Sequence, residues 1–394
     1  MARFLWLNWS GGGNLPPSLG VARALTERGH DVAFAGRPEM VSRVEQAGFR
    51  AIELTRAYEQ AELYPKDWPL WRMACYLSSP AVEEQVAAVI QAEAPDLLIV
   101  DQMFTAGLAQ AAKAPKPSVM MCHTLFLRHI DQYRAFCART NAGRQAAGFV
   151  PLPDADRLWF ERDLIVTTSL ASLDRRHPLP DGADKVRHVG PALEMERHAA
   201  PVDLPWSADD PTPLVLLSFS TGPEQGNVDK MQRTLDALAG LDVHVVATGG
   251  RSIDIGKVVA PGNAVALDAA DHDALMARAA LVVTHGGHGT MMRALKYGLP
   301  MLVMPGMAAD QAPNAAVVEE IGAGRSISQD ASVETIRAAA ADVLESPAFG
   351  IKAREIARQM TGMDGSLGAA LEIEALLASP AAAPRVDRSA KTRQ

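Results

Sequence analysis

The chain has 394 residues, a length that predicts two domains of roughly 150 residues or slightly more each. Hydrophobic residues make up 48% of it and charged residues 21%, as in ordinary soluble globular proteins. The formal net charge of −8 disfavours a nucleic-acid partner, which requires a basic face, and no block of Lys and Arg indicates a membrane surface.

Three features of the sequence favour a cytoplasmic protein. The three cysteines, Cys75, Cys122 and Cys137, are odd in number and not in CxxC spacing, which favours a reducing compartment and argues against a metal cluster. The apolar run at the N-terminus covers only about six residues, so it is better explained as a first strand than as a signal peptide. No segment approaches the about 18–20 apolar residues of a membrane span.

The first half of the chain alternates between apolar runs and helical patterns. Expected helices include residues 16–30 and 38–48. The expected strands cover residues 3–9, 31–36, 49–54, 96–102, 117–124 and 163–169. Near-continuous apolar strands separated by helices predict a parallel sheet covered on both faces.

A Pro- and Asp-rich segment at residues 194–213 lacks periodicity and is expected to be an interdomain linker. The alternation restarts after it, and the expected strands cover residues 214–220, 242–249, 264–269, 281–287 and 301–305. We therefore expect an α/β protein with two doubly wound parallel-sheet domains, 1–193 and 214–378, that face a cleft, followed by a disordered tail at 379–394.

A glycine-rich turn joins the apolar strand at 281–284 to a helix that begins near His288. The turn contains Gly286, Gly287 and Gly289, which allow a tight backbone turn and a close approach to a ligand. The start of the helix offers free N–H groups and a positive dipole end, so a phosphate or pyrophosphate is the expected occupant. Thr290 adds a hydroxyl donor and His285 an imidazole.

Polar residues also follow the next strand. Asp310 and Gln311 can accept hydrogen bonds from, and donate them to, the hydroxyls of a sugar, and Asn314 starts or caps a helix. His285 and His288 could instead form a metal pair, but no third ligand is spaced nearby, so we expect no metal.

The whole stretch has the pattern H-G-G-x-G-T, then G-x-P, then P-x-x-x-D-Q-x-x-N-A, with one extra residue between Pro305 and Asp310. It resembles the donor-binding motif of the glycosyltransferase family that includes plant secondary-product glucosyltransferases and bacterial macrolide glycosyltransferases. Residues 15–36 and 215–222 also resemble that family. The resemblance implies the GT-B fold of two Rossmann-like domains, and metal-independent transfer of a sugar from a nucleoside diphosphate, with inversion, to a small acceptor.

By this resemblance, one set of residues holds the diphosphate: Ser220, Thr221, His285, Gly287, His288, Gly289 and Thr290. Asp310 and Gln311 would hold the sugar hydroxyls. No cofactor is implied beyond the nucleotide-sugar, which is the substrate. A helix N-terminus and an imidazole can stabilise the departing diphosphate without a cation, and no DxD metal motif is visible.

The expected catalytic base departs from the family pattern. The family's histidine in the first loop is replaced by Asn14, whose amide cannot take a proton. The aspartate that normally orients this histidine is present as Asp101. Either Asp101 acts directly as the base, or His123, which also follows a strand, serves instead, or the acceptor is acidic enough to need little help.

Two further departures concern the nucleoside. The family's ribose-binding Glu is replaced by Arg293, which cannot accept hydrogen bonds from two hydroxyls. This replacement suits a deoxyribose (TDP) donor, whereas with a UDP donor backbone groups would hold the ribose. The Trp that stacks on the base in plant members is replaced by Ala269. Other contacts, such as backbone groups near Leu267, must then recognise the base.

The acceptor is expected to bind to the first domain. Residues 58–76 are rich in aromatic side chains and irregular, as suits a flat apolar acceptor, although such residues can equally form local core. The expected acceptor residues are Tyr64, Trp68, Trp71 and Phe126, with Met73, Tyr76, Phe104, Trp159 and Phe160 as further candidates. A lipophilic hydroxylated natural product, such as a polyketide, fits this composition.

The sequence leaves alternatives open. An O-linkage is the default, while the missing histidine keeps C- or N-glycosylation open. A nucleotide-sugar epimerase would need paired carboxylates around the sugar. A catalytically impaired accessory protein that binds a nucleotide-sugar is a further alternative, favoured by Asn14, Arg293 and Ala269. The sequence is compatible with a homodimer but does not indicate one.

Overall fold

The computed structural model describes residues 1–9, 12–64, 69–193, 204–207, 209–219, 227–250, 252–306, 308 and 310–379, with the backbone alone for 69–71. These residues form two compact units. The first contains Met1–Ala192 and the chain from Met363 onward, and the second contains Leu193–Gly362.

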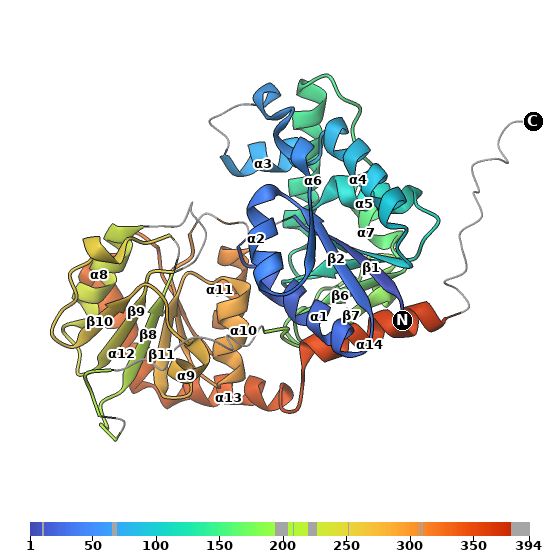
Figure 1. Ribbon diagram of the computed structural model, residues 1–394. Helices are drawn as coiled ribbons and strands as arrows, with labels where there is room; N and C mark the ends of the chain where they lie inside the picture. Colours follow the sequence, from blue (N-terminus) through green and yellow to red (C-terminus); the bar gives the residue numbers. More distant parts are fainter. Residues whose placement is uncertain are drawn as a thin grey trace, which may run out of the picture. The chain divides into compact units, whose positions relative to one another are not determined.

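The first unit is built on a seven-stranded parallel sheet with the strand order β3-β2-β1-β4-β5-β6-β7 (Figure 1). Its strands are β1 (Arg3–Leu7), β2 (Asp31–Gly36), β3 (Arg50–Glu53), β4 (Leu97–Asp101), β5 (Ser118–Cys122), β6 (Leu164–Thr167) and β7 (Val186–His188). The expected strands are confirmed, and β7 is an addition that the sequence pattern did not reveal.

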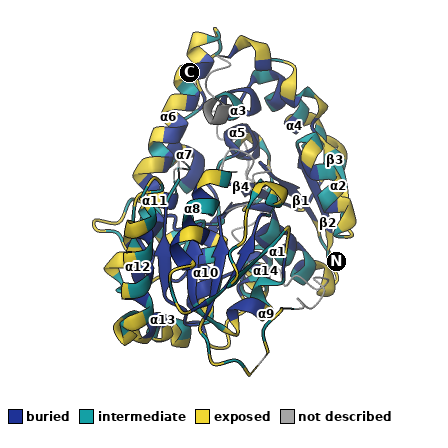
Figure 2. Cartoon of the chain, turned by 90° about the vertical axis from the view of Figure 1, so that its left-hand side faces the viewer, coloured by how far each residue is buried: buried dark blue, intermediate teal, exposed yellow. Residues whose placement is uncertain are grey.

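Helices cover both faces of this sheet, because successive strand residues point to opposite sides. The helices are α1 (Leu15–Glu27), α2 (Pro38–Gln46), α3 (Pro69–Leu77), α4 (Pro80–Glu93), α5 (Thr105–Lys113), α6 (Ile130–Ala146), α7 (Ala155–Phe160) and α14 (Gly365–Ala378). Trp6 and Phe34 pack with Leu19 of α1 on one face, whereas Leu7 and Val100 pack with residues of α3–α7 on the other. Exposed residues therefore lie on the outer faces of the helices, and the strands are mostly buried (Figure 2).

The second unit repeats this design with a six-stranded parallel sheet of order β10-β9-β8-β11-β12-β13. Its strands are β8 (Leu214–Ser218), β9 (His244–Thr248), β10 (Ala264–Leu267), β11 (Ala279–Thr284), β12 (Met301–Val303) and β13 (Gly324–Ser326). Its helices are α8 (Val228–Leu238), α9 (His272–Met276), α10 (His288–Lys296), α11 (Gln311–Glu320), α12 (Val333–Glu345) and α13 (Pro347–Gln359).

The structure corrects the expected end of the second domain. Residues 365–378 form α14, which belongs to the first unit and lies beside α1 (Figure 1). Ala369, Ala370 and Ile373 are fully buried in the same core as Trp6, and Glu374 accepts hydrogen bonds from Arg28 at 2.8 Å. Apolar burial against the first sheet therefore decides where the end of the chain packs.

The linker expected at 194–213 is only partly covered, since residues 194–203 and 208 lie outside the described residues, as do residues 380–394 of the expected tail. Its described end is fixed to the second unit. The Trp206 ring stacks on the His244 ring with centroids 4.3 Å apart, and Asp210 Oδ2 lies 3.0 Å from His244 Nε2.

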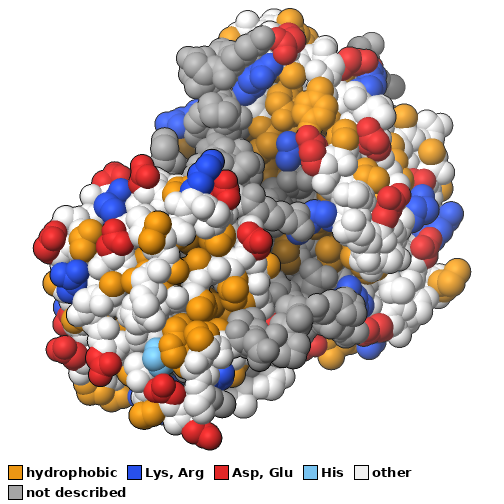
Figure 3. All heavy atoms as spheres, turned by 60° about the vertical axis from the view of Figure 1, so that its left-hand side comes forward, with side chains coloured by type: hydrophobic (Ala, Val, Ile, Leu, Met, Phe, Trp, Pro, Cys, Tyr) orange, Lys and Arg blue, Asp and Glu red, His pale blue; other side chains and the backbone are white. Residues whose placement is uncertain are grey.

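Acidic and basic side chains are interspersed over the described part of the face shown in Figure 3, without a continuous basic area. Of the helices in the described ranges, none has the length and apolar character needed to cross a bilayer.

Candidate functional site

The glycine-rich turn after β11 presents the N-terminus of α10 at the carboxyl edge of the second sheet, the edge at which its strands end. Gly286 has a φ of +85°, a left-handed conformation that favours glycine. A Cβ on Gly287 would collide with Nε2 of His285, whereas a Cβ on the exposed Gly289 would meet nothing within 4 Å. The first N–H groups of α10 are therefore accessible to an anion.

His285 is held beside this helix start as a neutral imidazole. Burial, reinforced by the charge of Lys230, lowers the pKa of His285 to about 3, against the opposing effect of a hydrogen bond to the backbone of Ser218. Its Nδ1 lies 3.5 Å from Oγ1 of Thr284. Above about pH 4 the ring can therefore act as a hydrogen-bond donor but not as a cation.

Asn314 connects the two halves of the sequence motif. Its Nδ2 donates to the carbonyl oxygen of Gly286 at 2.8 Å and lies 3.5 Å from Oδ2 of Asp310. Asp310 is the N-cap residue of α11, so the expectation that Asn314 begins or caps this helix is wrong. Oε1 of Gln311 accepts the N–H of Gly306 at 2.7 Å. These bonds bring Asp310 and Gln311 to the same edge as His285.

Arg293, at the position of the family's ribose-binding Glu, is paired with a carboxylate. Its Nη1 donates to Oδ2 of Asp273 on α9 at 2.9 Å, and both side chains are 13% exposed. Nearby, Nε2 of His272 lies 3.1 Å from Oγ1 of Thr248, and burial followed by the Arg293 charge lowers the pKa of His272 to about 4. Ala269 is exposed at the end of the loop after β10.

The first unit has its own polar cluster at the carboxyl edge of its sheet, formed by Asn14, Asp101 and His123. Asn14 is the N-cap residue of α1, Asp101 ends β4, and His123 follows β5. Nδ2 of Asn14 donates to Oδ2 of Asp101 at 2.6 Å, and the backbone N–H of Met103 donates to the other oxygen at 2.9 Å. Nδ1 of His123 lies 3.6 Å from Oδ2 of Asp101.

Asp101 and His123 differ in their burial and in their hydrogen bonds. Asp101 is 2% exposed, and both of its oxygens accept hydrogen bonds from protein groups. The His123 side chain is 19% exposed, so it is the more accessible of the two titratable groups. At 3.6 Å the contact between His123 and Asp101 is longer than a hydrogen bond, and Nδ1 of His123 is buried without a hydrogen-bond partner among the described residues.

The two expected acceptor residues whose side chains are described, Tyr64 and Phe126, are core residues. Tyr64 is 3% exposed, and Phe126 is fully buried with its ring edge-on to that of Trp159 at 5.5 Å. The structure thus assigns Phe126 a packing role, and contact with an acceptor stays a prediction. Trp68 lies outside the described residues, and only the backbone of Trp71, in α3, is described.

Two donor residues expected from the resemblance, Ser220 and Thr221, also lie outside the described residues. His288, Gly289 and Thr290 form the first turn of α10, as expected. The structure also shows Asp273 paired with Arg293, and Lys230 close enough to His285 to influence its pKa. The sequence motif indicated neither residue. Lys230 could have been noticed because a lysine in the first turn of a helix opposes the helix dipole.

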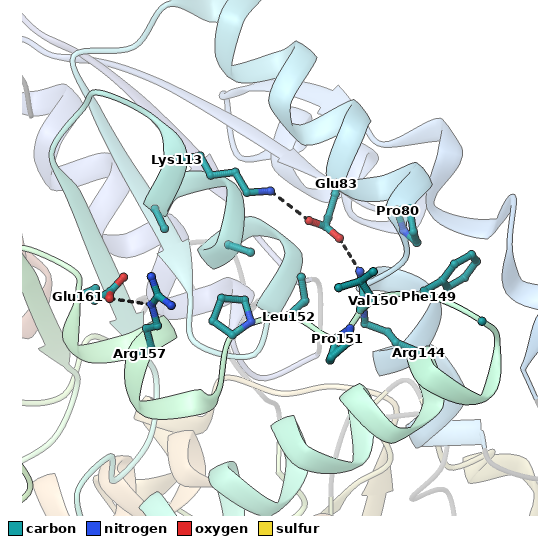
Figure 4. Close-up of a pocket in the computed structure, with 14 residues that line it drawn as sticks. Pro80, Glu83, Lys113, Arg144, Phe149, Val150, Pro151, Leu152, Arg157 and Glu161 are labelled. Carbon is teal, nitrogen blue, oxygen red and sulfur yellow. Dashed lines mark hydrogen bonds and ion pairs between the residues drawn. The ribbon is translucent and has the colours of Figure 1, made fainter. Parts of the chain in front are cut away.

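A cavity of about 720 Å³ in the first unit lies apart from these residues (Figure 4). It is lined by residues of α4–α7 and the α6–α7 loop, and Nη2 of Arg144 donates to Glu83 on its wall at 2.8 Å. Lys113, at the end of α5, also lines it. Because α5 starts just after Asp101 and runs back along the sheet, this cavity does not belong to the polar cluster of the first unit.

The chain is similar to known sugar-transferring proteins along most of its length. Residues 232–366 match the family model of the erythromycin biosynthesis protein CIII-like C-terminal domain. The NDP-glycosyltransferase YjiC of Bacillus subtilis is 24% identical over 389 residues, which cover 93% of this chain and 95% of that protein. The oleandomycin glycosyltransferase of Streptomyces antibioticus is 24% identical over 392 residues, covering 93% and 88%.

The fold has close counterparts among solved structures. The glycosyltransferase VinC, solved in complex with dTDP, superposes with a TM-score of 0.71 at 20% sequence identity. The match covers 95% of this chain and 99% of that one. These similarities confirm the resemblance indicated by the donor motif and the expected GT-B fold.

Proposed function

The chain is a glycosyltransferase with the GT-B fold, and we propose that it transfers a sugar, with inversion and without a metal, from a nucleoside diphosphate to a lipophilic small molecule. The observation that carries this proposal is the convergence of His285, the N-terminus of α10 and Asp310 on one edge of the second sheet, held together by Asn314. An edge with neutral donors for a diphosphate and a carboxylate for sugar hydroxyls suits a nucleotide-sugar.

The proposed diphosphate site needs no bound cation. The departing nucleoside diphosphate gains negative charge in the transition state, and the first turn of α10 supplies backbone N–H groups and a positive dipole end to meet it. The neutral His285 adds a directed hydrogen bond. Asp310 and Gln311 are proposed to hold the sugar hydroxyls.

The proposed base is His123, with Asp101 as the residue that orients it. The acceptor hydroxyl gives its proton to Nε2 of His123, and its oxygen forms the new bond to the anomeric carbon. The bond between that carbon and the diphosphate oxygen breaks, and the diphosphate leaves with the electron pair. A single displacement of this kind inverts the anomeric centre and makes an O-linkage. Asn14 holds Asp101 in place through the 2.6 Å hydrogen bond.

The proposed donors are TDP- or UDP-sugars, and the proposed acceptor is a natural product. The pairing of Arg293 with Asp273 leaves no free carboxylate at the Arg293 position to chelate a ribose, which favours a deoxyribose nucleotide. The solved complex of VinC with dTDP supports a deoxyribose nucleotide, and the similarity to the oleandomycin glycosyltransferase supports a natural-product acceptor.

Calorimetric titration of the protein with TDP and with UDP tests the donor site, with His285→Ala as the variant. We expect TDP to bind at least as tightly as UDP and the variant to lose binding of both. Lack of binding of both nucleotides to the unaltered protein would refute the donor site.

Turnover of TDP-sugars with a panel of polyketide acceptors tests the chemistry. His123→Ala and Asp101→Asn should each lower turnover by about 100-fold or more while nucleotide affinity is unchanged. The product's anomeric configuration, read by NMR, should be opposite to that of the donor. Retention of configuration would refute the single displacement, and full turnover by His123→Ala would refute the assignment of the base.

A further inference from the structure

Lys230 is a buried cation in an unfavourable place. It lies in the first turn of α8, where Oδ1 of the N-cap residue Asn227 accepts its backbone N–H at 2.8 Å. The side chain is buried, at 4% exposure. A positive charge in the first turn opposes the helix dipole, and its burial costs solvation energy. Without a compensating anion, an apolar side chain would stabilise this position better.

The described surroundings of Lys230 offer little compensation. Nζ donates to the carbonyl oxygen of Met304 at 2.5 Å and lies 4.2 Å from the centroid of the Phe219 ring. Among the described residues, no carboxylate forms an ion pair with it. The charged or titratable groups that influence it are Asp330, which follows β13, Arg233 of the same helix, and His285.

These neighbours place Lys230 at the carboxyl edge of the second sheet. Phe219 follows β8, Met304 follows β12, and His285 follows β11. Since β8, β11 and β12 are adjacent in the sheet, the ammonium group lies at the same edge of the sheet as the glycine-rich turn that presents the N-terminus of α10. The buried cation and the helix start therefore face the same small region.

We propose that Lys230 is a positioning residue for the departing nucleoside diphosphate, which is the anion that compensates its buried charge. The ammonium group supplies positive charge at the edge of the sheet that bears the glycine-rich turn, and it adds to the burial that keeps His285 neutral. This inference rests on the proposed donor site and adds a residue that lies outside the sequence motif.

The inference carries a specific pH dependence. Burial lowers the pKa of Lys230 to about 8, with Asp330 opposing and Arg233 reinforcing the shift. The positive charge is therefore present below about pH 8 and lost above it, so affinity for the diphosphate should fall as the pH rises through this value. At pH 8.5 a group with a pKa of about 8 is about one-quarter protonated, and a bound diphosphate raises the pKa again, so binding near pH 8.5 should take up as much as about three quarters of a proton.

Lys230→Met tests the inference, with Lys257→Met as the matched control, because Lys257 is 70% exposed in the same unit. TDP and UDP are titrated calorimetrically in two buffers of different ionisation enthalpy, so that proton uptake is measured together with affinity. At neutral pH, Lys230→Met should bind both nucleotides at least about tenfold more weakly, with no proton uptake near pH 8.5. It should unfold at the same temperature as the unaltered protein or higher, because a buried charge is removed. Lys257→Met should match the unaltered protein.

The possible results separate the two proposals. Weaker binding without proton uptake, in a variant that is at least as stable, supports the role of Lys230. Unchanged affinity in Lys230→Met, while His285→Ala loses binding, overturns this role and leaves the donor site standing. A variant with lower stability and weaker binding but undiminished proton uptake shows a structural role and also overturns the inference. Absence of nucleotide binding by the unaltered protein overturns the donor site itself.

Discussion

Replacing Asn14 with alanine tests whether this side chain holds the buried carboxylate of Asp101. In the folded protein, Asp101 is 2% exposed and accepts one hydrogen bond from the Asn14 amide at 2.6 Å and one from the Met103 backbone at 2.9 Å. The alanine variant leaves Oδ2 of Asp101 with only His123, at 3.6 Å. We therefore expect both a loss of stability and a loss of turnover.

The expected loss follows from the kind of hydrogen bond that is removed. A hydrogen bond to a charged group contributes about 1.5–3 kcal/mol, and a buried acceptor left without its donor loses most of this. The Asn14 amide also donates to Oδ1 of Asn8 at 3.0 Å, so the single variant measures more than one contact. A double-mutant cycle with Asp101→Ala isolates the pair, and we expect a coupling energy of about 2 kcal/mol.

Urea unfolding followed by tryptophan fluorescence is a suitable assay, because five of the six tryptophans lie in the first unit and only Trp206 lies in the second. Ser18→Ala is the control, since Ser18 donates to the Asn14 backbone but does not contact the carboxylate. A coupling energy below about 0.5 kcal/mol would refute the role of Asn14. Turnover should fall in Asn14→Ala while TDP affinity is unchanged, because the proposed nucleotide site lies in the other unit.

Three further outcomes are expected. Gly287→Ala should abolish nucleotide binding with little loss of stability, because the added Cβ displaces the His285 ring. Calorimetry measures the nucleotide affinity and a thermal melt measures the stability. Unchanged affinity would contradict the proposed contact between His285 and the diphosphate. Ile373→Ala should lower the free energy of unfolding of the first unit by about 2–5 kcal/mol, because this fully buried residue fixes α14 to that unit. Tryptophan fluorescence measures this loss. A loss of stability confined to the second unit would contradict the corrected domain boundary. Burial lowers the pKa of His129 to about 4, so the unfolded chain binds more protons than the folded chain between about pH 6.5 and pH 4. Stability should therefore fall by up to about 3 kcal/mol on acidification through this window, and His129→Phe should flatten that dependence in urea titrations at several pH values.

The sequence by itself determined the architecture and the donor motif. Buried parallel strands are apolar along their whole length, so runs such as 97–101 and 281–284 are visible without any tertiary information. The glycine-rich turn is equally local, because its conformation depends on residues adjacent in the chain, as the φ of Gly286 illustrates. The three-residue edge strands β7 and β13 were not predicted, because they are too short to carry a periodicity.

Only the tertiary structure decided which distant residues meet. The contact between Asn14 and Asp101 joins residues 87 positions apart, and Lys230 reaches Met304 across 74 positions. No spacing rule encodes such pairs, since they depend on which strands are neighbours in the sheet. The same holds for α14. Its apolar residues do not follow one face of the helix, so the sequence pattern does not predict which sheet the helix packs against, whereas the structure places Ile373 in the core of the first unit. Local patterns fix what each segment forms, whereas burial of apolar surface fixes what it packs against, and that choice depends on the whole chain at once.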